Sequence, residues 1–442
     1  MLSKANIAKI SLSNAVDGCK SRPYNGYTMS ALGFFREDCR LCHSTNLETF
    51  LDFGMHPHSD GFLREEQLQK PEPFFPLACA VCKDCGQVQL TYTVSPEHLY
   101  NEDYVYDGSV TKTGQDHFLG MAKSIVEKFA VPKDSLVIDI GSNVGLLLSG
   151  FKECGAKVLG IDPAIEPTKR AKERGIDSVV ECFTAEVAKK VAAEHGKAKV
   201  ITGTNVFAHV DDLDDLMQGA DALLDTDGVL VFESPYLKDL VEHMEYDTIY
   251  HQHVSYLAIS PLVKFFARFD MELFDVERTT IHGGSIRMFI ARKGTHPITD
   301  TVKNLIADEE KTGLWTPENL RTFAKNVETH RRELITMLQT LHDEGKTVVG
   351  IGAPAKGMTL LSYCGIHASL MPFLTEKSDW KQGKFAPGVH IPITSDDHLL
   401  KVQPDYALIL SWNFAPEIMK NLDAYKQAGG TFIIPVPSPT LV

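Results

Sequence analysis

Short apolar runs alternate with stretches of helical spacing along the middle of the chain. Apolar residues recur at helical intervals over 117–129, and a short apolar run follows at 135–140. Further apolar runs lie at 157–162, 199–202 and 228–233. Helical spacing predicts amphipathic helices, and short continuous apolar runs predict buried strands. Strands separated by helices predict a parallel sheet with helices on both faces.

The pattern changes on either side of this region. Residues 1–35 show no sustained period and predict a loose N-terminal arm. Residues 36–100 contain short segments separated by turns and are rich in cysteine, which predicts a small metal-binding module. A stretch near 236–300 interrupts the strand–helix alternation and is rich in Tyr, His and Gly. A helical pattern over 317–344 follows. Three more apolar runs come after it, at 346–351, 406–410 and 430–435. That tail predicts a second α/β unit.

Length and charge exclude several classes of function. The chain has 442 residues, which suggests two or three domains. It carries 44 Lys and Arg against 58 Asp and Glu, a net charge of −14, which disfavours general nucleic-acid binding and anionic-membrane binding. No apolar stretch approaches the roughly 20 residues of a membrane span, and the N-terminus lacks a secretory signal pattern. We expect a cytoplasmic protein with no nucleic-acid or membrane partner.

Five of the nine cysteines fall between positions 39 and 85. Stable disulfides are rare in the cytosol, and an odd total does not fit a complete disulfide framework. Two C-x-x-C pairs, Cys39/Cys42 and Cys82/Cys85, can present four thiolates tetrahedrally to Zn²⁺ and leave no position for water. We therefore predict a structural zinc site, with Cys79 as the spare cysteine. Free thiols or a redox pair are the alternative.

A glycine-containing turn follows the first predicted strand of the central region. It reads Asp139-Ile-Gly-Ser-Asn-Val-Gly145, which lets the backbone approach a ligand at a helix N-terminus and differs from the G-x-G-x-x-G of dinucleotide binders. At the end of the next strand, Asp162 is placed to accept hydrogen bonds from two ribose hydroxyls. This combination resembles class I S-adenosylmethionine-dependent methyltransferases, although a glycine turn by itself can serve packing alone. The donor-binding residues implied are Asp139, Gly141, Asn143, Gly145, Asp162 and Asn205.

Histidines and tyrosines cluster after the later strands of the same region. Asn205-Val-Phe-Ala-His209 follows one strand, and Tyr250-His-Gln-His253 lies in the segment that interrupts the alternation. A further motif reads Ile281-His-Gly-Gly-Ser-Ile-Arg287. A lone histidine is commonly a satisfied polar group of the core, which is the alternative here. Irregular segments after strand ends are where catalytic loops of doubly wound sheets lie, so we favour a catalytic site.

Taken with the cysteine pairs, these motifs resemble the nucleotide-sugar C-methyltransferases, in particular the dTDP-3-amino-4-ketohexose C3-methyltransferases. The resemblance runs from about residue 36 to the C-terminus. Its other matching segments are Phe75-Pro-Leu, Tyr104-Val-Tyr-Asp-Gly-Ser109, Gly350-Ile-Gly-Ala-Pro-Ala-Lys-Gly357, Lys381-Gln-Gly383, Pro387-Gly-Val-His-Ile-Pro-Ile393 and Ser411-Trp-Asn-Phe414. That many ordered matches make the resemblance specific.

The resemblance implies methylation of carbon in a nucleotide-linked 4-ketohexose. Methylating carbon requires a carbanion equivalent, which such a sugar offers at C3 by loss of its α-proton, with a general base and a group that stabilises the enolate oxygen. The family implies His253 as the base. Tyr250 and His209 would line the reacting face, and Tyr104 would close the site, with Tyr106 as the less favoured choice for the residue facing the substrate.

One position departs from the family. Relatives usually read Tyr-His-Glu-His, whereas this chain has Gln252 between the two histidines. Glutamine keeps the hydrogen-bonding shape of glutamate but loses its charge. We therefore hypothesise a substrate with a hydroxyl, not a cationic amine, beside the methylated carbon. Val144 replaces an Asp that relatives often carry in the glycine turn, which leaves a side-chain contact to the donor unsupported.

The C-terminal α/β unit contains a second glycine turn, with Gly350, Gly352 and Lys356 at a strand-to-helix junction. Such a junction suits a phosphate or sugar hydroxyls. By resemblance this unit holds part of the nucleotide sugar, with Trp412 and Asn413 nearby. A packing turn with a solvated lysine is the alternative.

We predict an α/β protein that binds S-adenosylmethionine and structural Zn²⁺. The predicted parts are an arm (1–35), a zinc-binding module (36–100), a Rossmann-like methyltransferase domain with a catalytic insertion (101–300) and a C-terminal Rossmann-like substrate-binding domain (301–442). Methyl transfer to oxygen or nitrogen of a sugar or other small molecule is the first alternative function. A non-catalytic scaffold is the second, and the intact glycine turn and histidine cluster speak against it.

Overall fold

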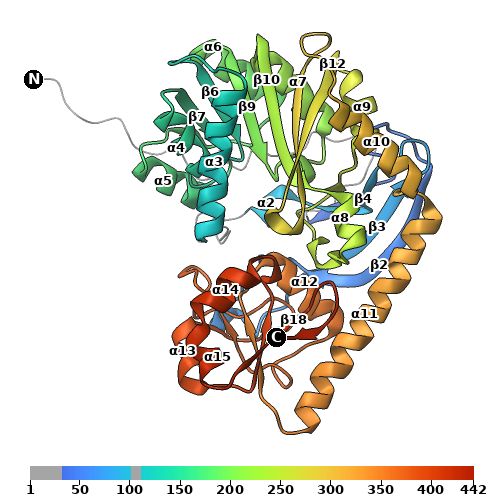
Figure 1. The fold of residues 1–442 in the computed structure, drawn as a ribbon, viewed down its shortest axis with the longest axis vertical. Helices are drawn as coiled ribbons and strands as arrows, with labels where there is room; N and C mark the ends of the chain where they lie inside the picture. The colour runs from blue at the N-terminus through green and yellow to red at the C-terminus, as the bar shows by residue number, and fades with distance from the viewer. Residues whose placement is uncertain (1–31, 101–110) are drawn as a thin grey trace, which may run out of the picture.

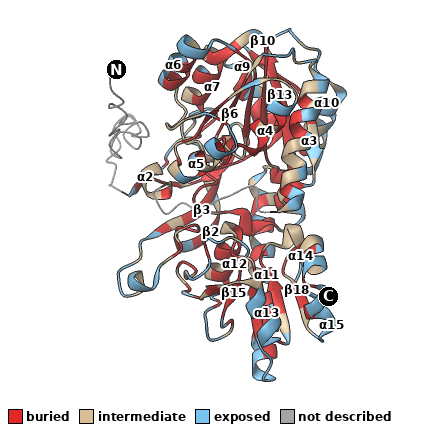
Figure 2. Ribbon diagram, turned by 90° about the vertical axis from the view of Figure 1, so that its left-hand side faces the viewer, coloured by how far each residue is buried: buried red, intermediate tan, exposed pale blue. Residues whose placement is uncertain are grey.

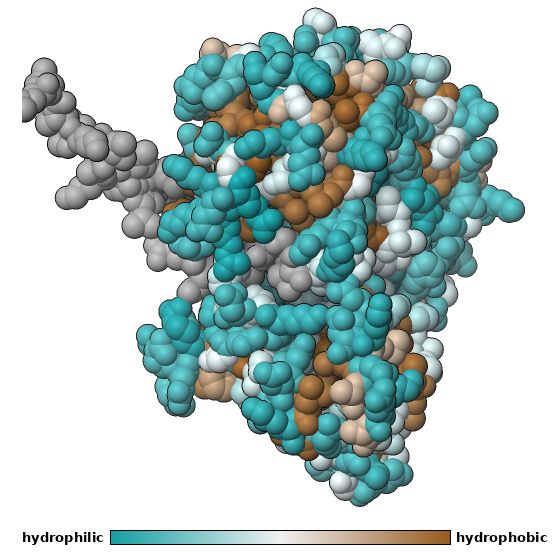
Figure 3. Space-filling view, turned by 60° about the vertical axis from the view of Figure 1, so that its left-hand side comes forward, coloured by the Kyte–Doolittle hydropathy of each residue, from teal (hydrophilic) through white to brown (hydrophobic). Residues whose placement is uncertain are grey.

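The computed structural model describes residues 32–100 and 111–442, so Tyr104 and Tyr106 lie outside the described residues. Two α/β lobes lie one above the other (Figure 1). The long helix α11 (Pro317–Asp343) runs along the side of the lower lobe, and strands of the Cys-rich module lie between the lobes. Hydrophilic side chains cover most of the face shown in Figure 3, with smaller apolar patches on both lobes.

The upper lobe contains a seven-stranded sheet with the strand order β12-β13-β10-β9-β6-β7-β8. Its strands are β6 (Leu136–Ile140), β7 (Lys157–Ile161), β8 (Ser178–Val179), β9 (Ala198–Thr204), β10 (Leu224–Pro235), β12 (Met271–Thr279) and β13 (Ser285–Arg292). The first five are parallel, and β13 runs antiparallel to β10 and to β12. The four strands predicted in this region are confirmed. Strands β8, β12 and β13 were not predicted; β8 has only two residues, and β12 carries charged residues along an edge of the sheet.

Alternation along the strands explains why helices cover both faces of this sheet. Val137 and Val200 pack with one group of helices, whereas their neighbours Ile138 and Ile201 pack with the other. Successive side chains of a strand point to opposite faces, so a continuous apolar run buries both. The first group is α3 (Lys112–Lys128), α4 (Leu146–Glu153) and α5 (Ile165–Glu173). The second group includes α6 (Ala185–His195), α7 (Leu213–Leu223) and α9 (Ile259–Ala267).

The lower lobe contains a six-stranded sheet with the order β16-β15-β14-β17-β18-β19. Its strands are β14 (Val348–Ile351), β15 (Leu374–Thr375), β16 (Ile393–Thr394), β17 (Tyr406–Ile409), β18 (Thr431–Ile434) and β19 (Thr440–Leu441). All neighbours are parallel except β18 and β19. Its helices are α12 (Ala355–Cys364), α13 (Asp396–Val402), α14 (Ala415–Asn421) and α15 (Asp423–Gln427). The predicted second α/β unit is confirmed.

The Cys-rich module is joined to the rest of the chain through a shared sheet. This sheet has the order β11-β4-β3-β2, with β2 (Leu47–Pro57), β3 (Phe74–Cys82), β4 (Val88–Leu90) and β11 (Ser255–Tyr256). Strand β11 comes directly after the Tyr250–His253 segment, and it pairs with β4. A separate pair is formed by β1 (Gly33–Phe35) and β5 (Tyr92–Val94). The module is therefore far from the catalytic segment in sequence, but its strand β4 is hydrogen-bonded to β11, which follows that segment.

One hydrophobic core extends through the module, the insertion and the lower lobe. It includes Phe53 of β2, Tyr246 of the insertion, Leu334 of α11 and Leu361 of α12. Figure 2 shows the buried residues concentrated on the sheets and on the inner sides of the helices. Among the helices of residues 32–100 and 111–442, none has both the length and the apolar character to cross a bilayer.

Candidate active site

A cavity of about 1300 Å³ is bounded by residues of the Cys-rich module, the upper lobe and the lower lobe. Most of the predicted site residues line it. From the described part of the chain these are Asp139, Gly141, Asn143, Asp162, Asn205, His209, Tyr250, Gln252, His253, Lys356 and Asn413. Clefts beyond the carboxyl ends of parallel strands are the usual ligand sites of such sheets.

The glycine turn after β6 forms one end of this cavity. Gly141 has φ +68°, and a Cβ placed there would lie 2.4 Å from a methyl carbon of Val206. Only glycine fits this conformation and this space, so the backbone is free to approach a ligand. Gly145, with φ +72°, is the N-cap of α4 and sits behind the residues that line the cavity.

Two buried carboxylates lie next to this turn. Asp162 follows β7 and accepts hydrogen bonds of 2.8 Å from the backbone N–H groups of Asn143 and Ala164, one on each oxygen. Each carboxylate oxygen retains a second lone pair that could accept a ribose hydroxyl. Burial raises the pKa of Asp162 to about 6. Asp139 accepts a 2.6 Å bond from Thr202 Oγ1, and burial raises its pKa to about 7.

The end of β9 presents a polar pair to the same cavity. Asn205 has φ +62°, and its Nδ2 donates a 3.2 Å hydrogen bond to Nε2 of His282. His282 has φ +60° and also lines the cavity. Burial lowers the pKa of His282 to about 3, so its ring is neutral. Left-handed backbone at two non-glycine residues in one site is the kind of strain that clusters at functional positions.

His253 and Tyr250 form a hydrogen-bonded pair that lines the cavity. Nδ1 of His253 donates to the carbonyl oxygen of Thr248 at 2.8 Å, because a carbonyl can only accept. Nε2 is therefore the unprotonated nitrogen, and it accepts a 2.8 Å hydrogen bond from the Tyr250 hydroxyl. Burial lowers the pKa of His253 to about 4, so the imidazole is neutral at pH 7 with its basic nitrogen toward Tyr250.

His209 completes this polar face. It ends a short 3-10 helix, Phe207–His209, and its ring centroid lies 5.0 Å from that of His253. Its Nδ1 is 3.2 Å from the Tyr100 hydroxyl. Burial lowers the pKa of His209 well below its ordinary value. The structure thus brings together three of the residues that the sequence assigned to the reacting face.

Lys356 reaches this cavity from the first turn of α12 in the lower lobe. Its Nζ donates a 3.0 Å hydrogen bond to Asn413 Oδ1 and lies 4.1 Å from the centroid of the Trp412 ring. Burial lowers the pKa of Lys356, while the carboxylates of Asp247 and Glu245 act in the opposite direction. Lys356 is 9% exposed, so the alternative of a solvated lysine is wrong.

Trp412 lies behind the cavity wall in the described structure. Its indole Nε1 donates a 2.7 Å hydrogen bond to Oδ2 of Asp247. Burial raises the pKa of Asp247 to about 6. Asp247 belongs to the 3-10 helix Tyr246–Thr248, three residues before Tyr250. The indole therefore connects the lower lobe to the catalytic segment.

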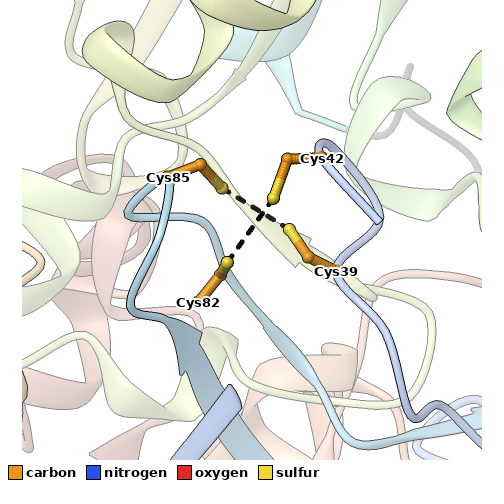
Figure 4. Close-up of side chains that lie close together, drawn as sticks. All are labelled: Cys39, Cys42, Cys82 and Cys85. Atoms are coloured by element: carbon orange, nitrogen blue, oxygen red, sulfur yellow. Dashed lines mark hydrogen bonds between the residues drawn. The ribbon is translucent and has the colours of Figure 1, made fainter. Parts of the chain in front are cut away.

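Four cysteines converge in the module, with Cys39 and Cys42 on one loop, Cys82 at the end of β3 and Cys85 on the turn that follows (Figure 4). All four Sγ atoms lie within 4.8 Å of one another, with Cys39–Cys85 at 3.5 Å and Cys42–Cys82 at 3.6 Å. Zn–S bonds of 2.3 Å in a tetrahedron place sulfurs about 3.8 Å apart, so the four thiols fit Zn²⁺. Cys79 lies outside this group, buried in β3.

The metal-binding loop is tied to the catalytic lobe by buried charges. Arg40, between Cys39 and Cys42, donates a 3.0 Å hydrogen bond from Nε to Oδ1 of Asp211. Arg36 forms a 2.9 Å ion pair with the other oxygen of Asp211. Asp211 lines the cavity and follows His209 by two residues. The zinc loop therefore supports the segment that carries His209.

Some cavity residues had no sequence signal strong enough to single them out. Asp60 lies in the Cys-rich module, far in sequence from every catalytic motif, yet it accepts a hydrogen bond from Gln252. His282 belongs to the motif Ile281–Arg287. The two glycines that follow it were the only sequence signal there for a backbone with positive φ. Lys381 belongs to the matching segment Lys381-Gln-Gly383 and also lines the cavity.

Three family models match successive parts of the chain. They are described as "Putative zinc binding domain" over residues 39–100, "Methyltransferase domain" over 117–276 and "C-methyltransferase C-terminal domain" over 280–437.

The chain is 34% identical over 407 residues to the C-methyltransferase NovU of Streptomyces niveus, covering 92% of this chain and 97% of that one. A ubiquinone biosynthesis O-methyltransferase of Actinobacillus pleuropneumoniae matches 22% of this chain and 44% of its own length at 36% identity. Among solved structures, the magnesium protoporphyrin IX methyltransferase of Synechocystis PCC 6803 with bound SAH covers 42% of this chain and 90% of its own, at 15% identity and a TM-score of 0.34.

The near full-length match decides between the functions left open by the sequence. The O-methyltransferase match covers only 22% of the chain, whereas the match to NovU covers 92% of it and therefore reaches into all three regions that the family models match. Carbon is therefore the acceptor atom, and the O- and N-methyltransferase and scaffold alternatives are set aside. The four-cysteine cluster belongs to the zinc-binding part of the same architecture. The chain belongs to the C-methyltransferase family and is an S-adenosylmethionine-dependent enzyme with a zinc-binding module.

Proposed function

We propose that this enzyme methylates C3 of a nucleotide-linked 4-keto-deoxyhexose through an enolate, with His253 as the base, in the synthesis of a branched deoxysugar. The observation that carries the proposal is the His253–Tyr250 pair, which lies in the same cavity as the glycine turn and Asp162. A base and a donor-binding turn in one cavity are what carbon methylation needs. We place this reaction in the cytoplasm.

The first step is removal of the C3 proton. The proton passes to Nε2 of His253, and the electron pair of the C–H bond becomes the enolate. Thr248 supports this role because its carbonyl accepts the Nδ1 proton and holds the ring in the tautomer with a basic Nε2. The Tyr250 hydroxyl donates to Nε2 of His253, and it would turn to the keto oxygen when the substrate enters.

The methyl donor would be held by the end of the cavity formed by β6, β7 and β9. Gly141 gives room for its backbone approach, and Asp162 would accept its ribose hydroxyls. An unpartnered buried oxygen on Ser142 also lies there, among the residues that the structure describes. S-adenosylmethionine supplies an electrophilic methyl group to the enolate carbon. Asn205 lines the same cavity and would position His282 through its hydrogen bond.

The lower lobe would hold the nucleotide sugar. Lys356 and Asn413 line the cavity as a hydrogen-bonded pair, and Lys356 would meet a phosphate or the enolate oxygen. Trp412 would act indirectly, by fixing Asp247 and packing against Lys356. The predicted closing role of Tyr104 or Tyr106 falls on residues outside the described structure and stays a proposal.

Mass spectrometry with S-adenosylmethionine and a panel of nucleotide 4-ketohexoses in deuterated water tests the proposal. We expect one substrate to gain one methyl group, which NMR places on C3. His253→Gln should abolish both methyl transfer and deuterium exchange at C3, whereas His342→Gln, a change at an exposed histidine of α11, should affect neither. A product methylated at another carbon, or exchange that persists in His253→Gln, would refute the proposal.

A further inference from the structure

A buried carboxylate from a distant part of the chain lies in the cavity wall next to the proposed base. Asp60 follows β2 in the Cys-rich module and is 6% exposed. Its Oδ2 accepts a 2.8 Å hydrogen bond from Nε2 of Gln252, and both side chains line the cavity. Because Gln252 directly precedes His253, the Asp60–Gln252 pair is adjacent to the reacting end of the cavity.

The hydrogen bonds of Gln252 involve its amide nitrogen and not its amide oxygen. Its Nε2 also lies 2.8 Å from Nε2 of His58. Burial lowers the pKa of His58 to about 3, so the ring is neutral and can accept at that nitrogen. The amide nitrogen thus faces two acceptors. The amide oxygen is buried and has no hydrogen-bond partner among residues 32–100 and 111–442. A lone buried acceptor is costly, so a donor group on a ligand would stabilise it.

The positive charge of a lysine acts on Asp60. Lys381 lies in the same cavity wall, 7% exposed, and its Nζ donates a 2.8 Å hydrogen bond to the carbonyl oxygen of Ala353. Burial raises the pKa of Asp60, and the positive charge of Lys381 opposes that rise. Burial also favours the neutral forms of the neighbouring groups. It lowers the pKa values of His58, His98 and His251 and raises the pKa of Tyr100. The amide oxygen of Gln252 is therefore an uncharged acceptor, and it lies beside a carboxylate whose charge Lys381 opposes.

We propose that Asp60 and Gln252 form a specificity site that binds an uncharged hydrogen-bond donor, a sugar hydroxyl, at or beside the methylated carbon. This inference rests on the proposed function. A hydroxyl satisfies the amide oxygen of Gln252 without adding charge. An ammonium group in that place would bring a second cation near Lys381, whose positive charge already acts on Asp60, and Asp60 already accepts a hydrogen bond from Gln252. A carboxylate at position 252 would reverse this preference.

The test compares two nucleotide-linked 4-ketohexoses that differ only in carrying a hydroxyl or an amine at that carbon. We expect the wild type to favour the hydroxyl substrate by about tenfold or more in kcat/KM, since a site built for one donor rejects a mismatched group. Gln252→Glu should move the ratio toward the amine by about tenfold, and Asp60→Asn should lower kcat/KM for the hydroxyl substrate. Asp343→Asn, which removes an exposed charge at the end of α11, is the control and should leave the ratio unchanged.

The outcomes separate the two proposals. If the wild type methylates these sugars but Gln252→Glu leaves the ratio at the wild-type value, the specificity assignment is wrong and the proposed function stands. A wild-type enzyme that methylates neither sugar overturns the proposed function and this assignment together. Calorimetric titration with S-adenosylmethionine shows whether each variant is folded, and if Asp60→Asn is not, Gln252→Glu alone decides.

Discussion

The burial of His253 predicts that deprotonation of the substrate continues at a lower pH than an ordinary histidine base would allow. An ordinary histidine has a pKa near 6.5, whereas burial lowers the pKa of His253 to about 4. When the pH falls from about 7.5 to about 6, an ordinary histidine retains roughly a quarter of its neutral form, whereas one with a pKa of about 4 retains roughly 99%. We therefore expect kcat/KM for deuterium exchange at C3 to change little over this interval.

The assay is the rate of deuterium incorporation at C3, followed by NMR at substrate concentrations well below KM, because kcat/KM reports the ionisation of the free enzyme. A fall of about fourfold between pH 7.5 and 6, with the midpoint near 6.5, would refute the assignment of His253 as a buried neutral base.

Acid stability must be separated from this effect. A histidine with a lowered pKa in the folded state stabilises the fold fully above the pKa of the unfolded chain, and that contribution is lost as the pH falls from about 6.5 toward the folded value. His253 and His282 both belong to this class, with pKa values lowered by burial to about 4 and about 3. The free energy of unfolding should therefore decrease below about pH 6.5. Circular dichroism at each pH identifies loss of activity that arises from unfolding.

Three further predictions concern the base, the donor site and the metal. Tyr250→Phe removes the hydroxyl bonded to His253 Nε2 and should slow exchange at C3 by about ten- to a hundredfold without changing the affinity for S-adenosylmethionine; an unchanged exchange rate would contradict the pairing. Asp162→Asn should weaken S-adenosylmethionine binding by about tenfold in calorimetry, and a wild-type Kd would exclude its role. Cys82→Ser should lose the one bound zinc ion, measured by elemental analysis, and lower the Tm, whereas Cys79→Ser should keep the metal; zinc retained by Cys82→Ser would disprove the four-cysteine site.

Periodicity predicted four of the five parallel strands of the upper sheet and the presence of a second α/β unit, because a strand buried on both faces is largely apolar. The two-residue strand β8 is too short to give that signal. Val137 and Ile138 face opposite helix layers, and neither position tolerates a polar group. β12 lies at the sheet edge and carries Glu272, Asp275 and Glu277, so its sequence lacks that signal. The paired cysteines were equally readable, because their spacing alone places two thiols on each turn.

Contacts between distant segments were decided only by the tertiary structure. Motif spacing and family resemblance pointed to His253 and Asp162, but no local pattern could place Asp60 against Gln252, 192 residues away. The same holds for Arg40 on Asp211 and for Lys356 beside the catalytic segment. Side-chain hydrogen bonds between distant segments have no period in sequence. They depend on how the module, the insertion and the lower lobe pack around one core, and that packing aligns the residues that the sequence keeps apart.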